Sequence, residues 1–110
     1  MYHSIENAID ALALECHEAA CKAGFWDQER NDGEAIALIH AELSELLEGL
    51  RRGNPPSDHI AEFKASEEEC ADVIIRLLDF AAGRGWRIGA VIRAKLEYNA
   101  SRPRKHGKEF

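Results

Sequence analysis

Apolar residues recur along the chain with a period close to 3.6 residues in four separate segments. This spacing gathers them on one face of an α-helix, whereas the strict alternation of a half-buried strand is nowhere sustained. The pattern therefore predicts an all-α protein. We expect helices over about residues 4–23, 33–52, 67–82 and 86–100, each followed by a glycine or proline stop signal.

The length of the chain and its links limit how these helices can be arranged. With 110 residues, one core can form but not two, so residues 1–110 are expected to make a single domain ending in a basic tail at 101–110. Four amphipathic helices of this size favour a four-helix-bundle-like fold. Because the link at Gly83–Gly85 is very short, the third and fourth helices are expected to be near-antiparallel neighbours. The other two links are long enough to cover a functional site.

The chain carries no signal for a membrane. No apolar run approaches the roughly 18 residues of a membrane span, and MYHSIENAID lacks the basic and apolar regions of a signal peptide. A cytoplasmic protein with no membrane partner is therefore expected. Cys16, Cys21 and Cys70 are odd in number and lack CxxC spacing. We expect them to be reduced and buried as small hydrophobic residues.

The net charge of −6 hides two parts of opposite sign. Residues 1–83 carry 6 basic and 18 acidic side chains, a net charge of −12, and residues 84–110 carry 8 and 2, a net charge of +6. An acidic body beside a basic end could hold cations and phosphates next to one another. Charge alone favours the simpler alternative, in which the tail pairs with the body or stays in solvent. No nucleic-acid polymer is expected as a partner.

The third segment, SEEECADVIIRLLDFAA, combines a wide apolar arc with one polar sector. Ser66 and Glu69 have the spacing of a capping box, so Glu69 could simply close the start of this helix. Capping does not account for Asp72, and aspartate is a poor residue for a helix interior. A functional site and a solvent-facing strip are equally good explanations of this sector, which holds Glu68, Glu69, Asp72, Arg76 and Asp79.

The second segment carries a similar pair, Glu42 and Glu45, at the shoulder of its apolar stripe. Taken alone, two glutamates three residues apart on a helix are most simply explained as solvent-exposed side chains. Helix pairing can nevertheless bring them to the acidic pair Glu69 and Asp72, with 23 residues between Glu45 and Glu69. Four carboxylates without a nearby histidine would form an all-oxygen site, which suits Mg²⁺ or Mn²⁺ rather than zinc.

The fourth segment places polar side chains on its apolar face. Lys95 and Asn99 lie within about 20° of Ile88 on a helical projection, and Arg102 continues the same line. A buried cation needs an anionic partner, which could be a carboxylate or a ligand phosphate. The alternative is a lysine that reaches solvent near a frayed helix end. Carboxylates for a metal and cations for phosphates together indicate hydrolysis of a phosphate ester or anhydride by a metal-activated water.

Two other classes of protein compete with this interpretation. A di-metal carboxylate bundle for redox chemistry needs Glu-x-x-His pairs, and none of the five histidines completes one. A non-enzymatic helical module, binding a nucleotide or another protein, would leave the carboxylates as a solvated surface. The second alternative stays open at this stage.

Over most of its length the chain resembles the MazG-like nucleoside triphosphate pyrophosphohydrolases of the all-α NTP pyrophosphatase superfamily. The resemblance lies in GFWD (24–27), IHAELSELLEGLR (39–51), EEECADVIIRLLD (67–79) and KLEYNASRPRKHGKEF (95–110). The family pattern is often EExxE followed by ExxD. Here Ala41 replaces the first glutamate, so a contact made by that residue in other members is missing.

The resemblance implies a MazG-type fold, cleavage of (d)NTPs between the α and β phosphates, and homodimers or homotetramers with the site near the subunit interface. The Mg²⁺ ligands implied are Glu42, Glu45, Glu69 and Asp72. Glu45 is the favoured group for orienting or deprotonating the water, because Ala41 cannot. The expected substrate-binding residues are Lys95, Asn99 and Arg102 at the phosphates, Phe25 and Trp26 at the base, and Arg76.

Overall fold

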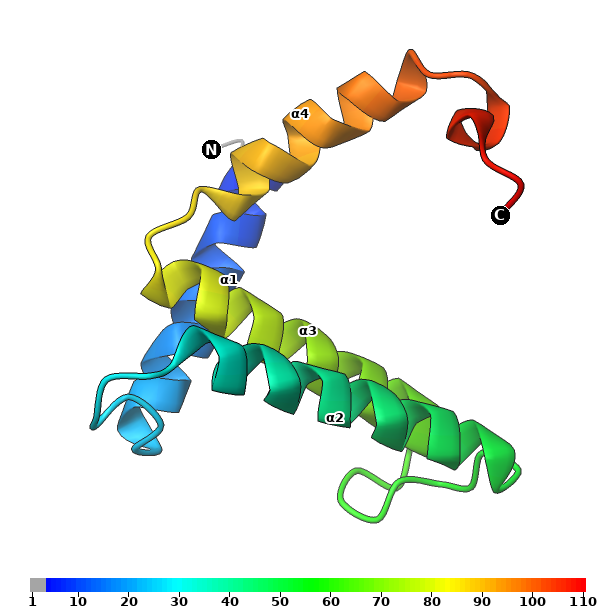
Figure 1. Cartoon of the computed structure of the whole chain (residues 1–110). Helices are drawn as coiled ribbons and strands as arrows, with labels where there is room; N and C mark the ends of the chain where they lie inside the picture. The colour runs from blue at the N-terminus through cyan, green and yellow to red at the C-terminus, as the bar shows by residue number, and fades with distance from the viewer. Residues whose placement is uncertain (1–3) are drawn as a thin grey trace.

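The computed structural model describes residues 4–110. Its helices are α1 (Ile5–Lys22), α2 (Asp32–Arg51), α3 (Ala65–Gly83) and α4 (Ile88–Ala100), followed by a short 3₁₀ helix at Arg104–Gly107 (Figure 1). No strand forms in this part of the chain apart from an isolated bridge between Pro56 and Lys64. The all-α prediction is confirmed, and the helix ends lie within about two residues of the expected ones. None of the helices in residues 4–110 combines the length and hydrophobicity needed to cross a bilayer.

The start of α3 differs from the sequence prediction. The capping box is formed by Glu67, whose Oε1 accepts a hydrogen bond from the backbone N–H of Lys64 at 2.9 Å. The backbone N–H of Ser66 instead donates to Asn54 Oδ1. The bridge between Pro56 and Lys64 fixes this start, since it makes Ala65 the first helical residue. The box predicted for Ser66 and Glu69 is therefore wrong, and the Glu69 side chain is not used as a cap.

The helices are not arranged as a compact bundle. Figure 1 shows α2 and α3 side by side and antiparallel, with α1 crossing α3. After the end of α3, α4 crosses the N-terminal end of α1 and then projects away from the other helices. The prediction that α3 and α4 are near-antiparallel neighbours is wrong. The short link turns α4 away at Gly85, whose φ is +72°.

A close approach between helices holds α4 on α1. The backbone N–H of Gly89 donates to Asp10 Oδ1 at 2.8 Å, and a Cβ at this position would lie only 2.2 Å from the carbonyl oxygen of Glu6. Arg93 adds an ion pair with the Glu6 carboxylate at 2.6 Å. The missing side chain of Gly89 therefore decides which helix α4 packs against.

The buried core is small for a chain of this length. Its centre is formed by Ala13, Cys16 and Leu78, between α1 and α3. The apolar stripe expected to be buried on α2 is largely open: Ile39 is buried, but Leu47 and Leu50 are 56% and 53% exposed. The radius of gyration is 16.4 Å, where a compact domain of this length would have about 13 Å. One chain alone therefore leaves a large apolar face of α2 and α3 uncovered.

Candidate functional site

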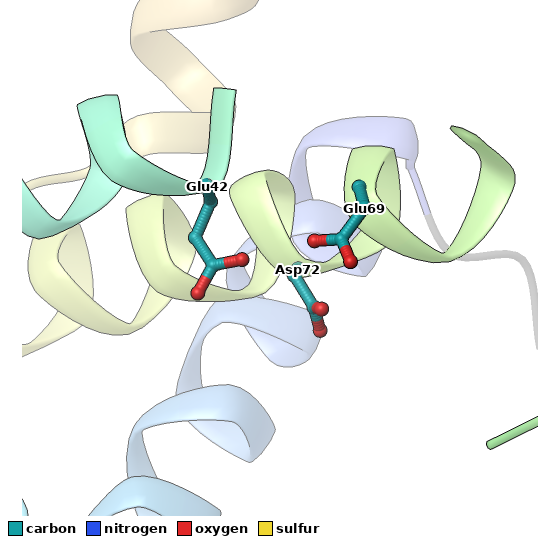
Figure 2. Close-up of side chains that lie close together, drawn as sticks. All are labelled: Glu42, Glu69 and Asp72. Carbon is teal, nitrogen blue, oxygen red and sulfur yellow. The ribbon is translucent and has the colours of Figure 1, made fainter. Parts of the chain in front are cut away.

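Three carboxylates meet where α2 runs along α3. Glu42 comes from α2, and Glu69 and Asp72 come from one side of α3, where a spacing of three residues places them on neighbouring turns. Figure 2 shows the three side chains pointing toward one another. One oxygen from each carboxylate lies within 4.8 Å of the other two. The antiparallel packing thus brings Glu42, from the acidic pair of α2, to both members of the acidic pair of α3, which is far away in the sequence.

This convergence strongly perturbs the titration of two carboxyls. Partial burial, the bond to Glu42 and the charge of Asp72 raise the pKa of Glu69 from 4.5 to about 7. Burial, followed by the charge of Glu42, also raises the pKa of Asp72. Carboxylates held together without a neutralising cation resist ionisation for these reasons. The cluster is therefore an electrostatically costly arrangement, of the kind that a bound cation would relieve.

One protein cation already contacts the cluster. The Nε of Arg76 donates to Glu42 Oε1 at 2.9 Å, and its guanidinium lies 6.0 Å from the ring centre of Phe25. Glu45, the other expected metal ligand, is exposed and stands outside the three-carboxylate cluster found among residues 4–110. Its role as a ligand or general base stays a prediction.

The loop before α3 adds a histidine beside the cluster. Ser57 is buried, and its hydroxyl donates to Glu68 Oε1 at 2.5 Å. The other oxygen of Glu68 lies 2.7 Å from His59 Nδ1. The bonds from Ser57 and then His59 lower the pKa of Glu68, while Glu68 raises that of His59. Glu68 is thus bound by its own loop, which distinguishes it from Glu69 and Asp72.

A hollow of about 320 Å³ opens next to the carboxylates. Glu42 and Asp72 form its acidic side, and the guanidinium-bearing side chains of Arg30 and Arg76 also line it. Phe25 lies at this hollow with 56% of its surface exposed. Alanines of α1 supply an apolar wall. The same cavity therefore combines negative groups, positive groups and a free aromatic ring.

Trp26 is packed against α3. Its indole N–H donates to Asp79 Oδ1 at 2.8 Å, and the guanidinium of Arg30 lies 4.9 Å from its ring centre. A Cβ on Gly83 would come within 2.5 Å of the indole, so only glycine admits the ring there. Of the two aromatic residues expected to stack on a base, Phe25 has the free face and Trp26 anchors the loop.

The expected phosphate-binding residues of α4 do not reach the carboxylates of the same chain. Lys95 lines a separate shallow hollow on α4 together with Val91, Ala94 and Tyr98. Two cations lie near the Tyr98 ring, with Lys95 Nζ at 4.8 Å and Arg102 Cζ at 5.5 Å from its centre. Asn99 Oδ1 is buried without a hydrogen-bond partner among residues 4–110. These side chains form a second polar group, away from the first.

The carboxylate cluster fits a hard divalent cation. Its donors are all oxygen atoms, and ligands on opposite sides of Mg²⁺ are about 4 Å apart, comparable with the separations found here. In the described part of the chain, residues 4–110, three protein donors converge, which leaves positions for water or phosphate oxygens. Magnesium commonly binds in this way. A nitrogen or sulfur ligand, as zinc favours, is absent from the cluster among residues 4–110.

Glu69 makes the stability of the metal-free protein depend on pH. Because its folded pKa of about 7 lies above the ordinary 4.5, its stabilising contribution is complete below about pH 4.5 and is lost as pH rises through 7. We expect the free energy of unfolding in a chelator to fall by roughly 1–2 kcal/mol between about pH 5 and pH 8, after allowance for solvent screening. Urea unfolding measures it, with Mg²⁺ expected to restore the loss at pH 8. An identical pH dependence in Glu69→Gln would contradict this assignment.

Several residues of this region escape sequence reasoning. Asp79 shares the polar sector of α3 with Asp72, and this shared face could have identified it. Arg30 lies in a loop, where helical periodicity does not predict the direction of a side chain. The contact of His59 with Glu68 depends on how the loop folds back on α3. Comparisons with protein-family models, curated proteins and solved structures gave no match to this chain.

Proposed function

We propose that this protein is a Mg²⁺-dependent nucleoside triphosphate pyrophosphohydrolase of the MazG-like type, which releases NMP and pyrophosphate. The observation that carries the proposal is the convergence of Glu42, Glu69 and Asp72. Glu42 and Asp72 of this cluster line a cavity that arginines and an exposed aromatic ring also line. The motif resemblance supports the choice of substrate. A triphosphate needs negative groups for its metal and positive groups for its remaining charge, and both line this one cavity.

Each group at the cavity has a role in this reaction. Bound Mg²⁺ would neutralise triphosphate charge and make an attacking water more acidic. Glu42, Glu69 and Asp72 hold the cation, while Arg30 and Arg76 face the phosphate oxygens and stabilise charge on the pyrophosphate as it leaves. The exposed ring of Phe25 offers its face to the base.

Glu45 is the proposed group that orients or deprotonates the water. It is exposed and has no ion-pair partner among the described residues, so its carboxylate is free to accept a proton. It follows Glu42 by one helical turn on α2, which puts it next to the cluster without being part of it. In this assignment Glu45 acts on the water, and the three clustered carboxylates bind the cation.

The working form is proposed to be a homodimer or homotetramer. Large apolar side chains of α2 and α3 are about half exposed, among them Leu47, Leu50 and Leu77, and uncovered faces of this kind mark protein interfaces. We further propose that Lys95, Asn99 and Arg102 serve the cluster of a second copy. The acidic body and the basic end, with net charges of −12 and +6, attract one another across such an interface.

A substrate panel tests the proposed reaction. The protein is incubated with the common NTPs and dNTPs in Mg²⁺, and pyrophosphate and orthophosphate are measured separately. Pyrophosphate with the matching NMP is the expected result, and it should disappear in EDTA. Orthophosphate as the first product would contradict the cleavage position. Nucleotide binding without turnover of any substrate would favour the non-enzymatic helical module.

A further inference from the structure

A thiol, an imidazole and a carboxylate form a hydrogen-bonded line on the side of α1. Cys21 Sγ lies 3.5 Å from His17 Nε2, and His17 Nδ1 lies 3.0 Å from Asp79 Oδ1. The first two residues are four apart on α1, and the third comes from α3. Cys21 is exposed, whereas Asp79 is buried. A nucleophile next to a base that a third group orients is the arrangement that activates a thiol.

The hydrogen bonds of Asp79 assign the proton on the imidazole. Its carboxylate accepts from the Trp26 indole N–H at 2.8 Å and pairs with Arg30 at 3.3 Å, so it acts as an acceptor throughout. His17 Nδ1 must therefore carry the proton that it shares with Asp79. The lone pair of Nε2 then faces the Cys21 thiol and can accept its proton.

The three cysteines provide a comparison within one molecule. Cys16 is buried, and burial raises the pKa of its thiol, so this residue should be inert. Cys70 is exposed on α3 without a hydrogen-bonded side-chain partner among residues 4–110. The expectation that all three are buried is wrong for Cys21 and Cys70. Cys21 is exposed and lies 3.5 Å from an imidazole nitrogen, so His17 is the group placed to activate it.

We propose that Cys21 is a modification site for small disulfides, with His17 as the base and Asp79 as the residue that positions it. The thiol gives its proton to His17 Nε2, and the Cys21 sulfur attacks one sulfur of R–S–S–R. That S–S bond breaks as the Cys21–S–S–R bond forms, and the leaving RS⁻ takes the proton back from the imidazolium. Cys21 is oxidised and the leaving sulfur is reduced, with no further reagent. The inference is independent of the proposed hydrolase activity.

The first test uses the wild-type chain and Ellman's reagent, an aromatic disulfide. Labelling under limiting reagent near pH 7, followed by peptide mass spectrometry, gives the rates of Cys21 and Cys70 in the same sample. We expect Cys21 to react about tenfold faster in the folded protein, and the two rates to become equal within about twofold in urea. An equal or slower rate for Cys21 in the folded protein would overturn the proposal.

Two variants test the roles of the partners. His17→Gln removes the base and should lower the Cys21 rate about tenfold, while the Cys70 rate stays unchanged as an internal control. Asp79→Asn should have the same selective effect, because an amide that donates to Nδ1 leaves the proton on Nε2, facing the thiol. Circular dichroism and the Cys70 rate report whether each variant is folded. If Asp79→Asn is misfolded, the test rests on His17→Gln and on the ratio of the Cys21 and Cys70 rates in the wild-type protein. An unchanged Cys21 rate in folded His17→Gln refutes the mechanism.

Discussion

Glu69→Gln is expected to lower Mg²⁺-dependent release of pyrophosphate by about 10²–10³-fold, and Asp72→Asn by a similar factor. Both substitutions keep the size of the side chain but remove a negative oxygen from the three that converge on α2 and α3. The cation would then be held by two carboxylates, one of which is already paired with Arg76. Initial rates at saturating nucleotide, measured over a range of Mg²⁺ concentrations, check the prediction. The loss should shrink at high Mg²⁺ if it reflects metal affinity.

Glu69→Gln, which is expected to lower activity, should raise the stability of the metal-free protein. Removing a carboxyl whose pKa stands at about 7 relieves repulsion, so Glu69→Gln is expected to unfold at higher urea than wild type in EDTA near pH 8. Glu48→Gln, an exposed change on α2, is the matched control and should alter neither activity nor stability. A Glu69→Gln protein with wild-type turnover would exclude the cluster as the metal site. A less stable, inactive one would point to misfolding.

Two inactive variants are expected to restore activity when they are combined in one dimer. In the first, Glu69→Gln and Asp72→Asn remove the carboxylates, and in the second, Lys95→Ala and Arg102→Ala remove the cations of α4. Because α4 crosses only the N-terminal end of α1 and projects away from its own chain's cluster, the two sets are proposed to meet across the subunit interface. A mixed dimer then carries one intact site and one doubly altered site. Random mixing should give about a quarter of wild-type activity.

Co-expression with two different tags, followed by tandem purification, isolates the mixed dimer for this measurement. Purified mixed dimers should reach about half of wild-type activity, since one of two sites is intact. A mixed dimer with no more activity than its parents would place both sets within one chain or remove α4 from the reaction. Full activity of the Lys95→Ala and Arg102→Ala parent would show that Arg30 and Arg76 suffice for the phosphates.

Much of the secondary structure follows from local chemistry that the sequence carries. The 3.6-residue period, Ser4 and Asn31 as N-caps, and the glycines that follow define where α1 and α2 begin and end. Glu69 and Asp72 share a face of α3 because three residues make nearly one turn. Such features depend only on residues within a few positions of each other. The helices and the acidic pairs were predictable for this reason.

Contacts between distant segments were not predictable in this way. The packing of α4 on α1 depends on the missing side chain of Gly89 at the Glu6 carbonyl, and the packing of Trp26 on α3 depends on its indole meeting Gly83. In the sequence, Gly83 looks like a glycine that merely ends a helix, and Gly89 like an ordinary residue near the start of one. The exposure of the α2 stripe was also misjudged, because periodicity identifies an apolar face but not whether its own chain covers it.

The sequence by itself determined four amphipathic helices, the two acidic pairs and the opposite charges of body and end. The tertiary structure alone decided that Glu42 joins Glu69 and Asp72 while Glu45 stands aside, and that Lys95 lies elsewhere. It also decided that Cys21 meets His17 and Asp79. The physical reason is the range of the interactions: helix period and capping act within a turn or two, whereas the meeting of side chains depends on how the helices cross.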